Sequence, residues 1–196
     1  MVLIPTAATW AESYTKFLAF NQTEYERILH LDSDSTVLQS MDELFLIQPA
    51  FVAMPRAYWL GFDDRVLSSQ LLLLQPSGYE FNRLMEITDK AGGGSYDMDI
   101  LTDLYKDYAM VLPHRPYDLL TGEFKGTEHS KYIGDPDVQW DPDAIMKELK
   151  FLHFSDWPLP KVRLKIPLHE FSHADSWIAL ARVSHSSRWS ETTMCC

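Results

Sequence analysis

The chain has 196 residues, a hydrophobic content of 46% and a formal net charge of −11, which suits a single domain with a substantial core. The negative charge argues against a nucleic acid or an anionic membrane as partner, because attraction to phosphate needs clustered Lys and Arg, and no stretch reaches the ~20 apolar residues of a membrane span. The cysteines, Cys195 and Cys196, are adjacent, so neither a disulfide framework nor a cysteine zinc site is expected.

The first expected elements are a helix and a buried strand. Thr9 and Glu12 form a capping-box pattern, and apolar residues recur at helical spacing to about Asn21. The apolar run 28–31 then predicts a buried strand.

This strand ends at two aspartates, Asp32 and Asp34. Open α/β folds bind ligands at the carboxyl ends of their strands, and carboxylates select Mg²⁺, Mn²⁺ or Ca²⁺. A simple turn is the other interpretation, since Asp and Ser favour turns by bonding their own backbone. The rest of the sequence must therefore decide between a cation site and a turn.

Strand and helix signals alternate along the rest of the chain. Residues 113–140 are loop-rich, and residues 167–196 have no clear period, so we expect a peripheral tail there. The alternation predicts an α/β domain with a largely parallel sheet that is covered on both faces. The expected strands are 51–54, 67–75, 109–112 and 151–154, and the expected helices are 77–91, 97–108 and one that begins at 141.

Two chemistries that the residues suggest could use the aspartate pair. A calcium loop of EF-hand type needs Gly at its sixth position, where this chain has Val37.

A phosphatase of the haloacid-dehalogenase type would use Asp32 as nucleophile and Asp34 as general acid, with Mg²⁺ as phosphate clamp. That class needs a later Lys and an acidic pair, which Lys90 with residues 97–99 supplies at too short a spacing. The phosphatase stays open as an alternative.

Five segments together carry a resemblance to a known family. They are Thr15-Lys16-Phe17, the stretch 27–45 with its H-L-D-S-D-S-T-V and D-E-L-F sequences, the stretch 67–77, the stretch 96–101 and the stretch 152–161. In this order they resemble the motifs of glycosyltransferase family 8, the glycogenin-like retaining enzymes of GT-A fold, and are closest to its fungal N-acetylglucosaminyltransferase-like members.

The resemblance implies a metal-dependent retaining glycosyltransferase. Such an enzyme moves a sugar (GlcNAc, Glc or Gal) from a UDP-sugar donor to a hydroxyl of a glycan or other acceptor. Asp32, Asp34 and His153 are then the ligands of Mn²⁺ or Mg²⁺, a mixed carboxylate and imidazole set that is compatible with Mn²⁺.

The same resemblance implies roles for other side chains. Lys16 and Lys161 are expected near the diphosphate of the donor, and Ser68 and Ser69 near the sugar hydroxyls. Asp97 and Asp99 are expected to be catalytic. They would accept a hydrogen bond from the donor sugar or stabilise an oxocarbenium ion, as glycosidase carboxylates do.

Some features depart from the family pattern. The family has two or more strands before its first helix, so we expect a partial GT-A-like domain over residues 1–166 that lacks them. An inactive truncated fragment is therefore a further alternative. Tyr96, Met98 and Asp156 replace family residues, which leaves the sugar open. The resemblance implies the Golgi or secretory lumen for some relatives, although no signal or anchor is recognised in the sequence.

Overall fold

The computed structural model describes residues 11–61, 63–91, 95–155, 176–181 and 193–195. Its strands form a six-stranded sheet in the order β5-β3-β4-β1-β8-β9 and a three-stranded sheet in the order β2-β7-β6. The strands are β1 (Arg27–Asp32), β2 (Ser35–Val37), β3 (Val52–Pro55), β4 (Leu71–Leu74), β5 (Met110–Leu112), β6 (Leu119–Leu120), β7 (Phe151–His153), β8 (Ser176–Ala181) and β9 (Thr193–Cys195).

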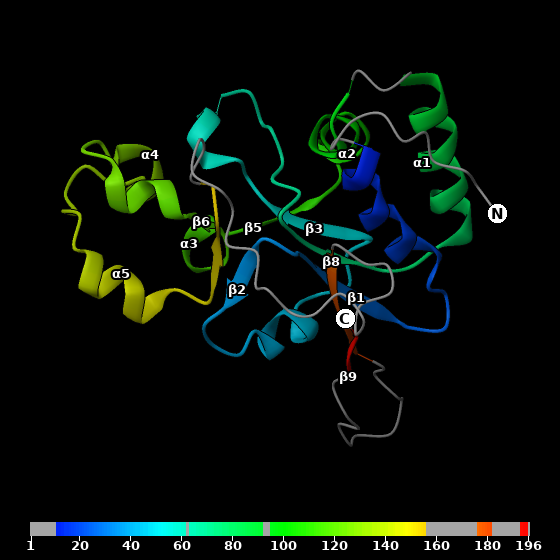
Figure 1. Ribbon diagram of the computed structural model, residues 1–196, viewed down its shortest axis with the longest axis horizontal. Coiled ribbons are helices and arrows are strands. Elements are labelled where there is room, and N and C mark those ends of the chain that lie inside the picture. The colour runs from blue at the N-terminus through cyan, green and yellow to red at the C-terminus, as the bar shows by residue number, and fades with distance from the viewer. Residues whose placement is uncertain (1–10, 62, 92–94, 156–175, 182–192, 196) are drawn as a thin grey trace, which may run out of the picture.

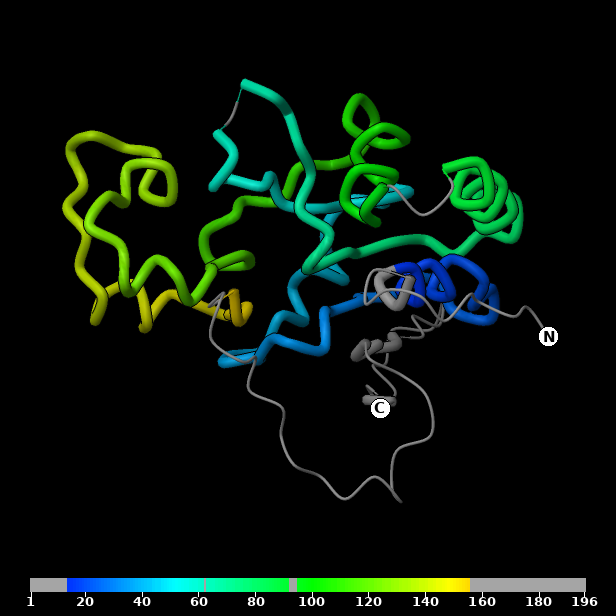
Figure 2. The backbone as a smooth tube through the Cα atoms, turned by 45° about the horizontal axis from the view of Figure 1, so that its top comes forward, coloured from blue at the N-terminus to red at the C-terminus, as the bar shows by residue number. Residues whose placement is uncertain are grey.

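Two groups of helices flank these sheets. The 3₁₀ helix η1 and helices α1 and α2 lie together beside the large sheet, whereas α4 and α5 lie on the far side of the small sheet (Figure 1). Figure 2 shows η1 and α1 side by side, where Ser77 N donates to Phe20 O at 2.8 Å. The α-helices are α1 (Gly78–Ala91), α2 (Asp97–Tyr105), α3 (His114–Tyr117), α4 (Ser130–Ile133) and α5 (Pro142–Glu148). The 3₁₀ helices are η1 (Ala11–Asn21), η2 (Asp42–Leu46), η3 (Tyr58–Leu60) and η4 (Thr121–Lys125).

The α/β class is confirmed, but the strand directions differ from the largely parallel sheet that the sequence predicts. Pairs β3–β5 and β6–β7 are parallel, and the other described pairs are antiparallel. The link between β3 and β4 contains η3 and no α-helix. Parallel neighbours need a long crossover, usually helical, and the link from β3 contains no such helix, so β4 returns antiparallel to β3. Helices α1 and α2 lie between β4 and β5 in the chain, and β5 runs parallel to β3.

Strand β1 is buried, as its apolar run predicts, and both of its faces are covered. Ile28 packs with Phe17 and Phe20 of η1 on one face. Leu29 and Leu31 point to the other face, where they pack with side chains of η2 and β7. This double cover holds the carboxyl end of β1, and therefore Asp32, at a fixed place in the fold.

The segment that the sequence assigns to a peripheral tail contributes two strands. Strand β8 pairs antiparallel with β1 from Arg27↔Ala181 to Asp32↔Ser176, and β9 pairs with β8. Strand β8 thus lies inside the large sheet, between β1 and β9, instead of at its periphery. The boundary at residue 166 stays a prediction.

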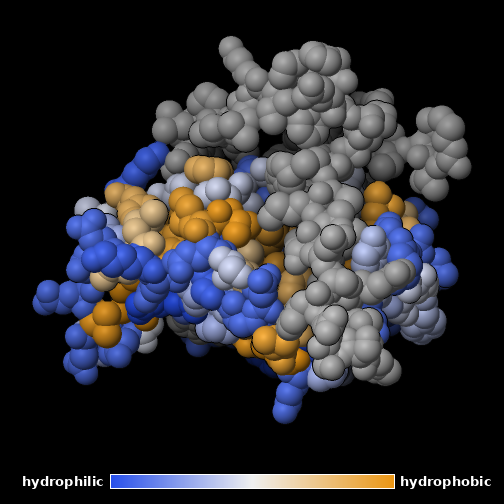
Figure 3. Space-filling view, turned by 90° about the horizontal axis from the view of Figure 1, so that it is seen from below, coloured by the Kyte–Doolittle hydropathy of each residue, from blue (hydrophilic) through white to orange (hydrophobic). Residues whose placement is uncertain are grey.

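The surface of the described ranges shows ordinary apolar exposure. Seen from below, hydrophobic residues reach the surface in patches among hydrophilic ones (Figure 3). Tyr79 and Leu46 are examples of large exposed side chains, at 76% and 68%. Such exposure is common in folded proteins and carries no functional conclusion. Within the described part of the chain, every helix is too short or too polar to cross a bilayer.

Candidate functional site

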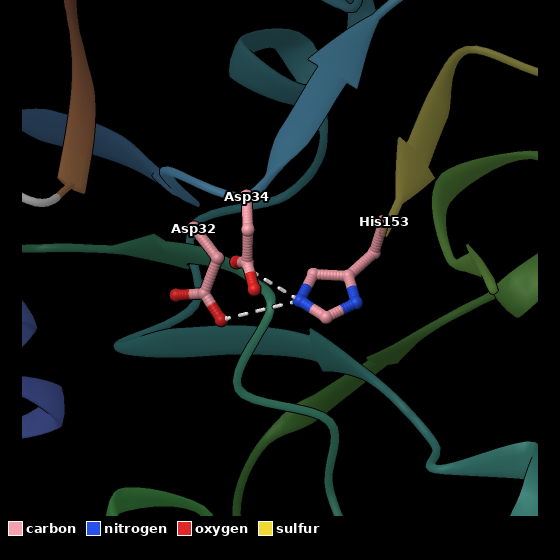
Figure 4. Close-up of side chains that lie close together, drawn as sticks. All are labelled: Asp32, Asp34 and His153. Atoms are coloured by element: carbon pink, nitrogen blue, oxygen red, sulfur yellow. Dashed lines mark ion pairs between the residues drawn. The ribbon is translucent and has the colours of Figure 1, made fainter. Parts of the chain in front are cut away.

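Three side chains from separate parts of the chain meet at the junction of the two sheets. Asp32 ends β1, Asp34 follows it in the turn to β2, and His153 ends β7 (Figure 4). His153 Nε2 lies 3.1 Å from Asp34 Oδ1 and 4.0 Å from Asp32 Oδ2. One ligand atom from each residue lies within 4.8 Å of the other two. The three residues that the family resemblance implies as metal ligands are therefore close enough to hold one ion.

Backbone pairing brings His153 to the aspartates. Strand β7 runs antiparallel to β2 with His153 opposite Ser35. One residue beyond this pair, Phe154 N donates to Asp34 O at 2.8 Å. The Ser35 hydroxyl donates to the carbonyl of Asp32 and so closes the turn between the two ligands. The geometry of the cluster is thus set by main-chain contacts.

The cluster is negative and partly open to solvent. The side chains of Asp32 and Asp34 are 21% and 19% exposed, and that of His153 is 10% exposed. Burial raises the pKa of the Asp32 carboxyl, and the Lys16 ammonium offsets part of this rise. Two carboxylates that face one imidazole form an oxygen and nitrogen donor set for a divalent cation, with further coordination positions left for a ligand.

Lys16 connects this cluster to α2. Its Nζ lies 2.9 Å from Asp32 Oδ1 and 2.5 Å from Asp97 Oδ2. It also donates to Ser69 O and Ser69 Oγ at 3.1 and 3.2 Å. Burial alone would lower the pKa of Lys16, but the two carboxylates outweigh it and raise the pKa. The structure therefore groups three other predicted site residues, Asp32, Asp97 and Ser69, around the buried ammonium of Lys16.

The remaining predicted residues lie in different settings. Asp99 Oδ2 accepts from Tyr96 N at 3.0 Å, a contact that satisfies a free N–H at the start of α2. Ser68 is fully buried, and its N–H donates to Pro55 O at 2.9 Å. Lys161 lies outside the described residues. The roles assigned to these residues stay predictions.

Asp118 is a buried acid beside the site that sequence reasoning missed. It directly precedes β6 and is 0% exposed. Burial raises the pKa of Asp118 to about 8, the nearby Ser68 hydroxyl opposes this rise, and the charge of Asp32 adds to it. The sequence carries no signal for this residue, since it lies in the stretch expected to be loop-rich.

No protein-family model matches the chain. Fungal proteins named glucose N-acetyltransferase 1 are similar to most of it. The protein of Gibberella zeae is 54% identical over 156 residues, which cover 78% of this chain and 35% of the relative. The protein of Aspergillus fumigatus is 51% identical over 163 residues, which cover 78% and 42%. The chain thus spans well under half the length of these relatives.

Solved glycosyltransferase structures share the fold. The WbbM bifunctional glycosyltransferase matches with a TM-score of 0.57 at 16% identity, over 77% of this chain and 32% of that one. The glycosyltransferase GlyE of Streptococcus pneumoniae matches with a TM-score of 0.54 at 17% identity, over 82% and 39%. The chain therefore has a GT-A-like α/β fold of the glycosyltransferases, and its aligned part is related to the fungal glucose N-acetyltransferases 1, which confirms the resemblance that its motifs predict.

Proposed function

We propose that this chain is part of a metal-dependent retaining glycosyltransferase that moves a sugar (GlcNAc, Glc or Gal) from a UDP-sugar to an acceptor hydroxyl. The observation that carries the proposal is the convergence of Asp32, Asp34 and His153 in a fold shared with glycosyltransferases. The fungal relatives are named glucose N-acetyltransferase 1, and the solved structures that share the fold are glycosyltransferases.

The three ligand side chains would hold Mn²⁺ or Mg²⁺ through Asp32 Oδ2, Asp34 Oδ1 and His153 Nε2. A cation bound there neutralises negative charge on the departing nucleoside diphosphate. Lys16 binds the other carboxylate oxygen of Asp32, Oδ1, at 2.9 Å. This ion pair orients the carboxylate so that Oδ2 faces His153.

Asp97 is the stronger of the two proposed catalytic carboxylates. It shares Lys16 with a metal-ligand candidate, and it is 8% exposed. This position suits a carboxylate that accepts a hydrogen bond from the donor sugar or stabilises positive charge at its anomeric carbon. Asp99 is engaged at the helix start. Contacts of Lys16 and Lys161 with the diphosphate, and of Ser68 and Ser69 with sugar hydroxyls, belong to the same proposal.

The alternative phosphatase is less well supported. A nucleophilic Asp32 needs a carboxylate oxygen that can attack phosphorus, but here one oxygen is bound by Lys16 and the other faces His153. A phosphatase of that type also has no use for an imidazole in the cluster. The glycosyltransferase explains the imidazole as a ligand.

Hydrolysis of UDP-GlcNAc, UDP-Glc and UDP-Gal, with Mn²⁺ and with a chelator, tests the proposal. Asp34→Asn should abolish Mn²⁺-dependent hydrolysis and weaken UDP binding in the presence of Mn²⁺. The matched control is Asp107→Asn, whose side chain is 55% exposed and pairs only with Arg65 among the described residues. Equal activity of Asp34→Asn and the parent chain would contradict the proposal, as would a parent chain that does not bind UDP with Mn²⁺.

A further inference from the structure

A second concave site lies beside α4, outside the metal cluster. Its volume is about 230 Å³, and Glu128, His129, Ile133, Asp135 and Trp140 are among the residues that line it. Pockets for drug-sized ligands usually measure about 300–1,000 Å³. This pocket therefore suits one ring of a larger molecule, and it is too small for a whole nucleotide sugar.

The apolar wall of the pocket is aromatic. The rings of His129 and Trp140 stack with centroids 4.0 Å apart at an interplanar angle of 13°. Phe124 contacts Trp140 edge-on at 5.6 Å, and Ile133 is buried beneath the pocket at 6% exposure. The aromatic ring of Trp140 offers an apolar surface against which the C–H groups of a sugar ring can pack.

The polar wall consists of two carboxylates that are already oriented. Glu128 Oε1 accepts from Ser130 N at 3.0 Å, and Asp135 Oδ1 accepts from Asp137 N at 2.9 Å. Backbone contact with Ser130 lowers the pKa of Glu128, so it is ionised at neutral pH. An ionised carboxylate has about four lone-pair sites, which leaves each residue free acceptor capacity for hydroxyl groups.

The charge of the lining selects among ligands. The residues that line the pocket within the described ranges include no Lys or Arg. Two carboxylates therefore repel phosphate, so the diphosphate end of the donor is a poor occupant. A neutral molecule that combines an apolar face with several hydroxyl donors fits both walls.

Helix η4 connects the pocket to the metal cluster. In the middle of η4, Glu123 Oε2 lies 3.2 Å from His129 Nδ1 in the pocket wall. At its start, Thr121 Oγ1 accepts from Ser155 N at 3.1 Å, two residues beyond His153. One short helix therefore contacts both the aromatic wall and the loop that follows the third ligand of the cluster.

We propose that this pocket is a saccharide subsite that holds a distal sugar residue of the acceptor glycan, while the hydroxyl that receives the transferred sugar lies at the metal cluster. The proposal rests on the proposed glycosyltransferase function. The pocket then binds a neutral hexose within an oligosaccharide. Substitutions in the pocket should change the binding of long acceptors and leave use of the UDP-sugar donor unchanged.

Ligand-detected NMR tests the subsite without catalysis. The probes are glucose, maltose and maltotetraose and the corresponding mannose oligosaccharides, each titrated into the full chain. Tetrasaccharides should bind, and the exposed variants Glu128→Gln and Asp135→Asn combined should weaken that binding about tenfold or more, since they remove charge-assisted hydrogen bonds. Glu86→Gln, an exposed carboxylate on α1, is the matched control and should bind like the parent chain.

The same experiment separates failure of the subsite from failure of the enzyme. Mn²⁺-dependent hydrolysis of UDP-sugar in the absence of acceptor should be unchanged in the double variant. Hydrolysis without saccharide binding would overturn the subsite alone, and saccharide binding without hydrolysis would overturn the proposed function alone. Binding of tetramethylammonium in place of the saccharides would identify the pocket as a cation site and overturn the subsite.

Discussion

His153 Nε2 lies 3.1 Å from Asp34 Oδ1 because β7 pairs with β2 in a register that sets His153 opposite Ser35. The two residues are far apart in the sequence, and this ladder brings them together. A side chain fixed by backbone pairing has little freedom to move away, so the positions of the three side chains are set before any ligand binds.

His153→Ala removes the imidazole and leaves the carboxylates of Asp32 and Asp34 in place. We expect Mn²⁺ affinity to fall by at least about 10-fold to 100-fold, because even the loss of a group that only hydrogen-bonds to a metal ligand lowers metal affinity by that much. Isothermal titration with Mn²⁺ measures the change. His129→Gln, a substitution in the pocket beside α4, should leave Mn²⁺ affinity unchanged. Equal affinity of His153→Ala and the parent chain would show that the imidazole is not a ligand.

Lys16→Met leaves the largely buried carboxylates of Asp32 and Asp97, which are 21% and 11% exposed, without their cation. Removing one partner of a buried ion pair destabilises proteins by about 3–5 kcal/mol, and urea unfolding should show a loss of this order. Lys106→Met is the control. It removes an exposed ion pair in which Lys106 Nζ lies 3.8 Å from Asp103 Oδ1, and it should lower the free energy of unfolding by at most about 1 kcal/mol.

The double variant Lys16→Met with Asp97→Asn extends this measurement. Its loss of stability should be smaller than the sum of the two single losses, because neutralising Asp97 removes one of the stranded charges. Strictly additive losses would contradict the buried network around Lys16.

Asp118 should make the folded chain less stable as pH rises. Its pKa is about 8 in the folded chain, whereas an unfolded Asp ionises near pH ~3.9. Between these values the folded chain holds a proton that the unfolded chain has lost, so the free energy of unfolding falls by at most about 1.4 kcal/mol per pH unit. The stability that the protonated Asp118 carboxyl contributes is complete below the pKa of the unfolded chain, and it is lost as pH rises through the pKa of the folded chain.

Asp118→Asn removes this titration. Urea unfolding between about pH 5 and about pH 8, with a chelator present, should therefore show a smaller loss of stability in this variant than in the parent chain. Asp107→Asn, at an exposed carboxyl, should retain the slope of the parent chain. An unchanged slope in Asp118→Asn would mean that the carboxyl is already ionised in the fold.

Asp99 and Asp97 should respond differently to substitution. Asp99→Ala removes the acceptor of Tyr96 N and should cost about 0.5–2 kcal/mol of stability, as capping losses do, with UDP-sugar hydrolysis retained. Asp141→Ala is a comparison with a similar expected cost, since Asp141 Oδ1 accepts from Asp143 N at the start of α5. Asp97→Asn should abolish hydrolysis. Loss of hydrolysis in Asp99→Ala, with normal stability, would instead make Asp99 a catalytic residue.

Local signals in the sequence predict the elements well. The run 77–91 corresponds to α1 (Gly78–Ala91), and the Asp-Pro-Asp start at 141 corresponds to α5 (Pro142–Glu148). The strand expected at 67–75 is shorter in the structure, Leu71–Leu74, because Leu67 bridges to Arg56 and Ser68 N bonds Pro55 O before the ladder with β1 begins. Capping and periodicity are properties of neighbouring residues, and for this reason they can be read along the chain.

Contacts between distant segments could not be predicted in the same way. Strand direction depends on how each link crosses the sheet, and the sequence alone did not reveal that β4 runs antiparallel to β1 and β3. The residues of the metal cluster came from the family resemblance, since no periodicity relates His153 to the aspartates. The complete burial of Asp118 arises from tertiary packing that the surrounding loop-rich sequence does not reveal.

Strand β7 is the middle strand of the small sheet, between β2 and β6. The unfolded chain cannot present His153 beside Asp32 and Asp34, so a cation held by all three binds only molecules in which this sheet has assembled. Added Mn²⁺ should then shift the folding equilibrium by mass action, and the rise in melting temperature with Mn²⁺ concentration should report how tightly the assembled site binds the ion.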